Sequence, residues 1–163
     1  MKTANTSSQN AETVRLPADM RTGLGEQQLL MFALESVQEV ALDSKPGLKG
    51  PPHYRPQMML TLLGYCYATG LYGSRDIEEA IGSDPTLRYI CAHTYPNWRA
   101  ISQFRRQHRD WVEQHLAGVL QRAALPLFRQ SPEEGSPADC QRFAAAARSR
   151  VETAIIMDGA VLD

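Results

Sequence analysis

The chain has 163 residues, 43% of them hydrophobic, which is enough apolar material for one core but leaves little room for a second domain of ordinary size. Its 17 basic and 18 acidic side chains nearly cancel, so it is not a generally cationic protein. The average hides an asymmetry, because residues 45–109 carry nine Lys and Arg against four acids, a balance of +5, and the remainder carries −6. Overall net charge therefore does not exclude a basic surface that binds nucleic acid.

The cysteines Cys66, Cys91 and Cys140 are odd in number and widely spaced, which favours neither a disulfide framework nor a CxxC metal site. They point to a reducing compartment. The first residues do not have the pattern of a signal peptide, and no apolar run approaches the ~20 residues that cross a bilayer. We expect a cytoplasmic protein that makes no membrane contact and uses no metal or cofactor.

In chain order, residues 1–24 begin with a polar stretch without an apolar period, and we predict a flexible arm there. From Gly25 to about residue 41 the apolar side chains recur at helical spacing and predict a first amphipathic helix. These side chains are Leu29, Leu30, Ala33, Val37, Val40 and Ala41. Prolines and glycines over residues 43–56 then predict a loop that ends where Pro56 can occupy the first turn of a helix.

The helix predicted over residues 56–72 is apolar nearly all round, which is typical of a helix in the middle of a bundle. Three shorter helices follow, each with a start signal: Ser74 for the first, Asp84 with Pro85 for the second, and Asn97 for the third. Short helix, turn, short helix and longer basic helix is the order of a helix-turn-helix type of arrangement.

The third of these helices, residues 97–109, carries the chemistry. Ile101, Phe104 and His108 form its apolar stripe, and Trp98 is also expected in the core. The opposite face is polar and consists of Arg99, Ser102, Gln103 and Arg106. Between Asp84 and Asp110 there are five arginines and no acid, so this helix lies in a local positive field suited to phosphate.

These residue types predict a division of labour on DNA. Arg99, Gln103 and Arg106 are assigned to the groove, since Arg can address guanine and Gln adenine through paired hydrogen bonds. Arg105 and Arg109 lie off that face and are assigned to phosphate contacts that set position.

After Arg109 the sequence allows either one helix continuing to about Ala124, or a kink with a new helix beginning at Trp111, since Asp110 and Glu113 have the spacing of a capping box. Residues 126–135 read as a linker, and residues 136–163 as a C-terminal amphipathic helix. Its apolar stripe from Cys140 to Ile155 is predicted to pack back on the domain or to pair with a second copy as a homodimer.

Two segments, HYRPQMMLTLLGYCYATGLYGSRDIEEAI and LRYICAHTYPNWRAISQFRRQH, together resemble the N-terminal domain of bacterial insertion-sequence transposases of the InsH type. The resemblance covers roughly residues 51–124 and supports the domain predicted over residues 25–125. The succession of helical periods separated by Pro and Gly predicts an all-α helical bundle. The resemblance implies that this domain binds double-stranded DNA at the terminal inverted repeats of the element, ahead of an RNase H-like domain with three metal-binding carboxylates.

Only Asp158-Gly159, in IIMDGAVLD, is similar to the strand that bears the first of those carboxylates. One or two carboxylates cannot assemble a metal site for phosphoryl transfer, so we expect DNA binding and no enzyme activity. Within that expectation the chain is a truncated transposase or one part of a split enzyme. Alternatively it is a stand-alone transposase-derived regulator, or a helical dimerisation protein with no role on DNA.

Overall fold

The computed structural model describes residues 16–40, 54–127 and 137–162, and these residues form eight helices and no strand. The helices are α1 (Arg21–Leu24), α2 (Glu26–Val37), α3 (Pro56–Ala68), α4 (Ser74–Ile81), α5 (Pro85–Cys91), α6 (Trp98–Gln107), α7 (Arg109–Leu127) and α8 (Pro137–Leu162). The predicted all-α class is therefore confirmed. The parts of the expected arm, loop and linker that fall on residues 1–15, 41–53 and 128–136 lie outside the described residues.

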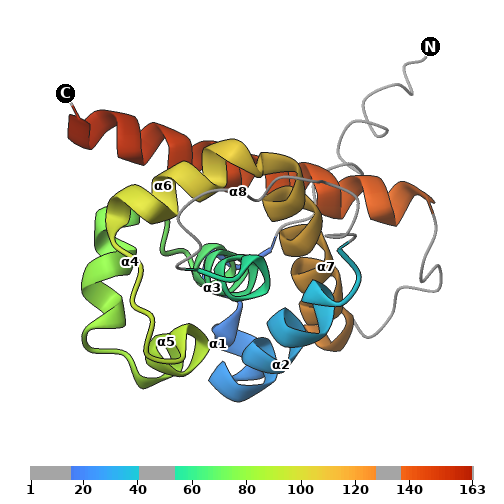
Figure 1. Ribbon diagram of the computed structural model, residues 1–163. Coiled ribbons are helices and arrows are strands. Elements are labelled where there is room, and N and C mark those ends of the chain that lie inside the picture. The colour runs from blue at the N-terminus through green and yellow to red at the C-terminus, as the bar shows by residue number, and fades with distance from the viewer. Residues whose placement is uncertain (1–15, 41–53, 128–136, 163) are drawn as a thin grey trace, which may run out of the picture.

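Helix α3 occupies the centre of the molecule, with the other helices arranged around it (Figure 1). Every side chain from Met59 to Ala68 is buried, as the sequence pattern predicts for a helix without a polar face. Pro56 occupies the first turn, where its missing N–H has no cost. The helix ends at Ala68, earlier than residue 72, and Gly70 follows it with a φ of 86°, a value that glycine adopts without strain.

Helices α6 and α7 are separated by a break at His108, whose φ and ψ of −125° and 38° are not helical. Of the two alternatives left by the sequence, this is the kink, although α7 begins at Arg109 rather than at Trp111. The His108 ring stacks on Trp111 at a centroid distance of 4.5 Å and packs against Phe104 at 4.8 Å. The break therefore lies on the core side of the helix pair.

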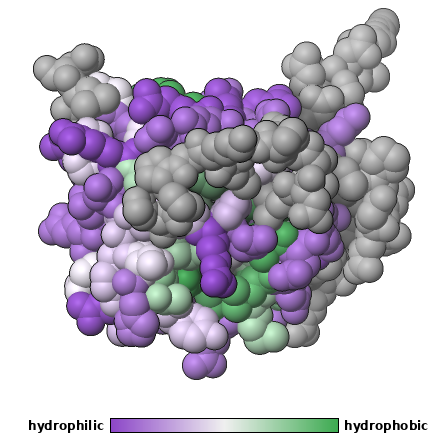
Figure 2. Space-filling model, in the orientation of Figure 1, coloured by the Kyte–Doolittle hydropathy of each residue, from purple (hydrophilic) through white to green (hydrophobic). Residues whose placement is uncertain are grey.

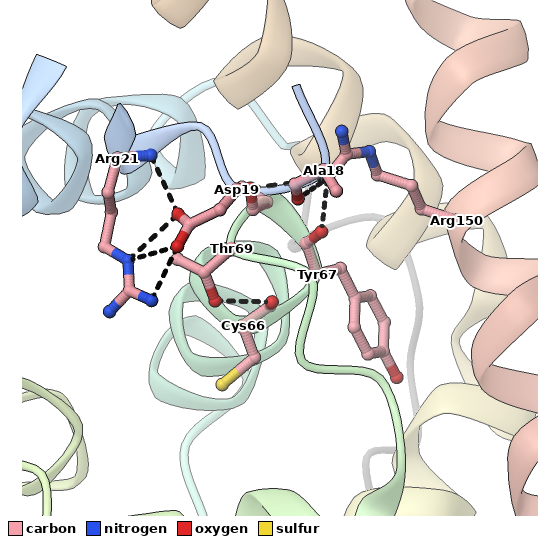
Figure 3. Close-up of polar contacts among 8 residues, drawn as sticks. Ala18, Asp19, Arg21, Cys66, Tyr67, Thr69 and Arg150 are labelled. Atoms are coloured by element: carbon pink, nitrogen blue, oxygen red, sulfur yellow. Dashed lines mark hydrogen bonds and ion pairs between the residues drawn. The ribbon is translucent and has the colours of Figure 1, made fainter. Parts of the chain in front are cut away.

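The segment before α2 is part of the folded domain from residue 16 onward, whereas the sequence pattern predicts a flexible arm over residues 1–24. Met20 is fully buried, and its backbone N–H donates to Ala68 O at 2.9 Å. Arg150 of α8 reaches the same place, where it crosses from α8 to the end of α3 (Figure 3). Its guanidinium donates to four backbone oxygens, those of Pro17, Ala18, Tyr67 and Ala68, at 2.6 to 3.3 Å.

Arg150 therefore binds the negative end of the α3 dipole and ties three segments together. Burial lowers the pKa of Arg150. These hydrogen bonds of Arg150 could not be predicted from the sequence, because they are made to backbone oxygens and not to an acidic side chain. The surrounding sequence is polar and gives no other signal.

Helix α8 packs back along α7, with Ala147, Val151 and Ala154 fully buried. The packing that the apolar stripe predicts is confirmed for these residues. In Figure 2, hydrophilic residues predominate along the upper edge, over α6 and α8, and apolar residues gather near the centre of this face. Within the described ranges, no helix combines the length and the apolar character needed to cross a membrane.

Candidate nucleic-acid interface

The turn before α6 is fixed by local hydrogen bonds. Helix α5 ends at Cys91, its C-cap Ala92 adopts the left-handed conformation with a φ of 48°, and His93 follows with a φ of 72°. The Thr94 hydroxyl donates to Cys91 O at 2.7 Å, and Asn97 Oδ1 accepts from the backbone N–H of Ala100 at 2.9 Å. Asn97 is thus the N-cap that the sequence predicts, and it sets the direction in which α6 leaves the turn.

Three of the six predicted DNA-binding residues share an exposed face. Arg99, Gln103 and Arg106 are four and three residues apart, a spacing that puts them on one side of a helix, and all three are exposed. Among the described residues, none of these side chains is paired with a carboxylate. The structure therefore brings together two guanidinium groups and one carboxamide that are available to a partner.

The other three predicted residues are placed differently. Ser102 is buried, so it does not belong to the polar face on which the sequence analysis puts it. Arg109 is 40% exposed and donates to Glu113 at 2.8 Å, with Glu152 of α8 at 3.5 Å. Hydrogen bonding to Glu113 raises the pKa of Arg109. Its charge is thus partly offset by two carboxylates before any phosphate arrives.

Arg105 is only 2% exposed, and a phosphate cannot reach it without a change in the fold. Its Nη1 donates to Asp158 Oδ2 of α8 at 2.5 Å and to Ser74 Oγ at 3.3 Å. Burial opposes the charge, yet the Tyr67 hydroxyl and the Asp158 carboxylate together hold the pKa of Arg105 above its usual value. Its assignment as a phosphate contact is therefore replaced by an internal ion pair.

Asp158, the residue that resembles a catalytic aspartate in the sequence, lies on helix α8 and not on a strand. Its carboxylate accepts from the backbone N–H of Ser74 at 2.8 Å and from the Ser74 hydroxyl at 2.6 Å. Helix α4 therefore receives its N-terminal cap from α8, since Gly73 precedes it and has no side chain to do so. Ser74, predicted as a start signal, is instead the first residue of the helix.

One surface arginine that the sequence analysis does not assign lies beside α6. Arg75 of α4 is exposed, and its guanidinium carbon is 4.5 Å from the centre of the Trp98 ring. Arg99 lies over the same ring at 5.3 Å. Trp98 is half-buried, so it is neither a full core residue nor a free one. Two cations from different helices thus converge on one indole at the start of α6.

Comparison with protein families finds a match over part of the chain. Residues 31–107 match the family described as Transposase domain (DUF772), and the match runs from within α2 to the last residue of α6. No curated protein and no solved structure matches the chain. The chain therefore contains a transposase-related domain, and the basic helix α6 forms the end of it.

Proposed function

We propose that the chain binds double-stranded DNA through the exposed face of α6 and recognises the terminal inverted repeats of a mobile element. The observation that carries this proposal is the face of Arg99, Gln103 and Arg106, which has no paired carboxylate and lies within the matched transposase domain. A solvated helix face normally mixes both signs of charge, and a face of this kind fits the negative potential of a groove.

The order of α4, α5 and α6 supports a helix-turn-helix mode of binding, in which α6 is the recognition helix in the major groove. In that mode Gln103 and Arg106 read base edges, because amide and guanidinium groups form paired hydrogen bonds with adenine and guanine. Arg109 contributes weakly, as its charge is shared with Glu113 and Glu152. Arg105 holds the helix in place from the inside, through its ion pair with Asp158.

The test is a titration of the chain with a duplex of its own element end and with a scrambled duplex. Gln103→Ala and Arg106→Ala should each weaken binding to the element end by about 1–3 kcal/mol and leave binding to the scrambled duplex nearly unchanged. Arg148→Ala, an exposed arginine on α8, is the matched control and should change neither.

Affinity for both duplexes should also fall steeply between about 50 and 200 mM salt, because each neutralised phosphate releases counterions. Wild-type chain that bound neither duplex at low salt would rule out the proposal and favour the interaction-protein alternative. Equal affinity for the two duplexes would support DNA binding but contradict specific recognition of the repeats.

A further inference from the structure

We propose that Arg75 of α4 and Arg99 of α6 bind one DNA backbone phosphate beside Trp98, which gives the interface a second helix. The inference rests on the proposed function and changes one assignment within it, since Arg99 becomes a phosphate contact and not a base reader.

Two like charges contact the same indole ring. Because both guanidinium carbons lie within 4.5 and 5.3 Å of the same ring centre, they are less than about 10 Å apart, within one Debye length at 0.1 M salt. Neither arginine is paired with a carboxylate among the described residues. Their mutual repulsion is therefore offset only by the ring, until an anion arrives.

The Arg75 side chain contacts Trp98 although two acidic side chains lie nearby on its own helix. Glu78 and Glu79 follow it at the three- and four-residue spacings that favour ion pairs along a helix, yet the guanidinium lies over Trp98 of the neighbouring helix. The Asp76 carboxylate points toward Gly73 at the start of α4. Its Oδ2 atom lies 2.6 Å from the position that a Cβ atom added to Gly73 would occupy. The indole thus holds Arg75 at the ring that Arg99 also contacts.

An indole face attracts a cation by about 0.5–1 kcal/mol at exposed sites, which orders a guanidinium without neutralising it. The charge and the planar row of N–H donors remain free, and that row matches the oxygens of a phosphate. Ordering before binding lowers the entropy lost when the contact forms. The arrangement fits a phosphodiester, whose single charge is shared by two oxygens.

Glu78 and Glu79 also limit where DNA can approach α4. They are exposed on the next turn of α4 and would repel a backbone that followed the helix. The approach of DNA is thus confined to the first turn of α4, where Arg75 lies. One phosphate at this point sets the register of α6 in its groove, and carries no sequence information itself.

The experiment measures binding of the full chain to its element-end duplex and to the scrambled duplex over a series of salt concentrations. Arg75→Ala, Arg99→Ala and the double variant are compared with wild type, with Arg148→Ala as control. Each single variant should lower affinity for both duplexes alike, by about tenfold, and should keep most of the slope of log K against log salt, because the remaining arginine still neutralises the phosphate.

Because the two arginines share one phosphate, only the double variant should lose slope, by about 0.9. A loss near twice that size would overturn the shared site. Arg75→Lys should keep the salt slope and recover only part of the affinity, as lysine is a point charge.

Each remaining outcome has a distinct meaning. If Arg75→Ala lowered the unfolding midpoint but left both affinities unchanged, the Arg75–Trp98 contact would be structural only and the inference would fail. The proposed function would still stand if Arg106→Ala lost its preference for the element-end duplex. If Arg99→Ala affected only the element-end duplex, Arg99 would be a base reader and the shared site would again fail. Absence of binding by wild type would remove both proposals.

Discussion

His115 is buried in the core, where it donates a hydrogen bond from Nε2 to Ala33 O at 2.8 Å. The carbonyl can only accept, so the neutral ring carries its proton on Nε2, and Nδ1 has no hydrogen-bond partner among the residues that the structure describes. Burial lowers the pKa of His115 to about 4. A histidine in the unfolded chain has a pKa near 6.5, so protonation favours unfolding.

The first prediction at the residue scale follows from that difference. Between about pH 6.5 and pH 4 the unfolded chain binds the proton and the folded chain does not, so stability must fall as the pH is lowered through this window. We expect His115 to account for a loss of about 2 kcal/mol in the free energy of unfolding between pH 7 and pH 5. Urea unfolding of wild type and His115→Gln at both pH values measures it, because carboxylate titration is common to the two chains. An equal loss in His115→Gln would contradict the prediction.

At the same scale, the sequence predicts which side chains of α6 are polar but not which are accessible. Arg99, Gln103 and Arg106 are recognised correctly as one exposed face because helical spacing alone decides it. Arg105 follows Phe104 on the side that α8 covers, and its partner Asp158 is 53 residues further along the chain. No local signal links the two, and an arginine is rarely buried without such a partner. Arg75 was missed because its partner is an aromatic ring on another helix, which a charge count does not reveal.

At the scale of elements, α3 and α7 approach each other closely at Gly64. A Cβ added to Gly64 would lie 2.2 Å from the Cε1 and Nδ1 atoms of His115, whose ring is held by its hydrogen bond to α2. The helix pair thus meets at a glycine. Gly159 of α8 is the opposite case, because nothing lies within 4 Å of its added Cβ.

These two helical glycines give a matched pair of predictions. Alanine improves helix propensity at either position by about 1 kcal/mol. At Gly64 the overpacking cost of about 1–3 kcal/mol, or more where the neighbour is fixed, should outweigh that gain. We therefore expect Gly64→Ala to lower, and Gly159→Ala to raise, the midpoint of thermal unfolding. The double variant Gly64→Ala with His115→Ala should be destabilised by less than the sum of the two single-variant effects, because the smaller side chain at 115 makes room for the added Cβ.

The elements themselves follow from local signals. Pro56, Asp84 and Asn97 mark helix starts correctly because a cap or a first-turn proline acts on residues no more than four positions away. The start of α4 could not be read in the same way, since its cap comes from Asp158. The ordered segment at residues 16–24 was also missed, because Met20 is a single apolar side chain in a polar stretch and its anchor is Arg150.

At the scale of the whole molecule, α8 belongs to the same folding unit as the transposase-related domain. It contributes Ala147, Val151 and Ala154 to the core, the Arg150 anchor to the end of α3, and the Asp158 cap to α4. Its residues follow the region that matches the family, which ends at 107. The orientation of the basic helix α6 therefore depends on a helix outside the matched region, through the pair of Arg105 and Asp158.

The last prediction tests whether this dependence is cooperative. Ala154→Asp places an unpaired carboxylate in the interface between α8 and the core, whereas Ala145→Asp places the same group on the exposed side of the same helix. The buried charge should reduce the free energy of unfolding by several kcal/mol, and the exposed one by about 0.5 kcal/mol from helix propensity. Both tryptophans, Trp98 and Trp111, lie outside α8, so their fluorescence reports on α6 and α7 while circular dichroism at 222 nm reports on all helices. In Ala154→Asp the two signals should move together to a lower denaturant concentration, because one core is shared. If the helical signal declined first and the fluorescence transition stayed at its wild-type midpoint, α8 would be a separable tail, and the ion pair of Arg105 and Asp158 would not be needed to hold α6 in place.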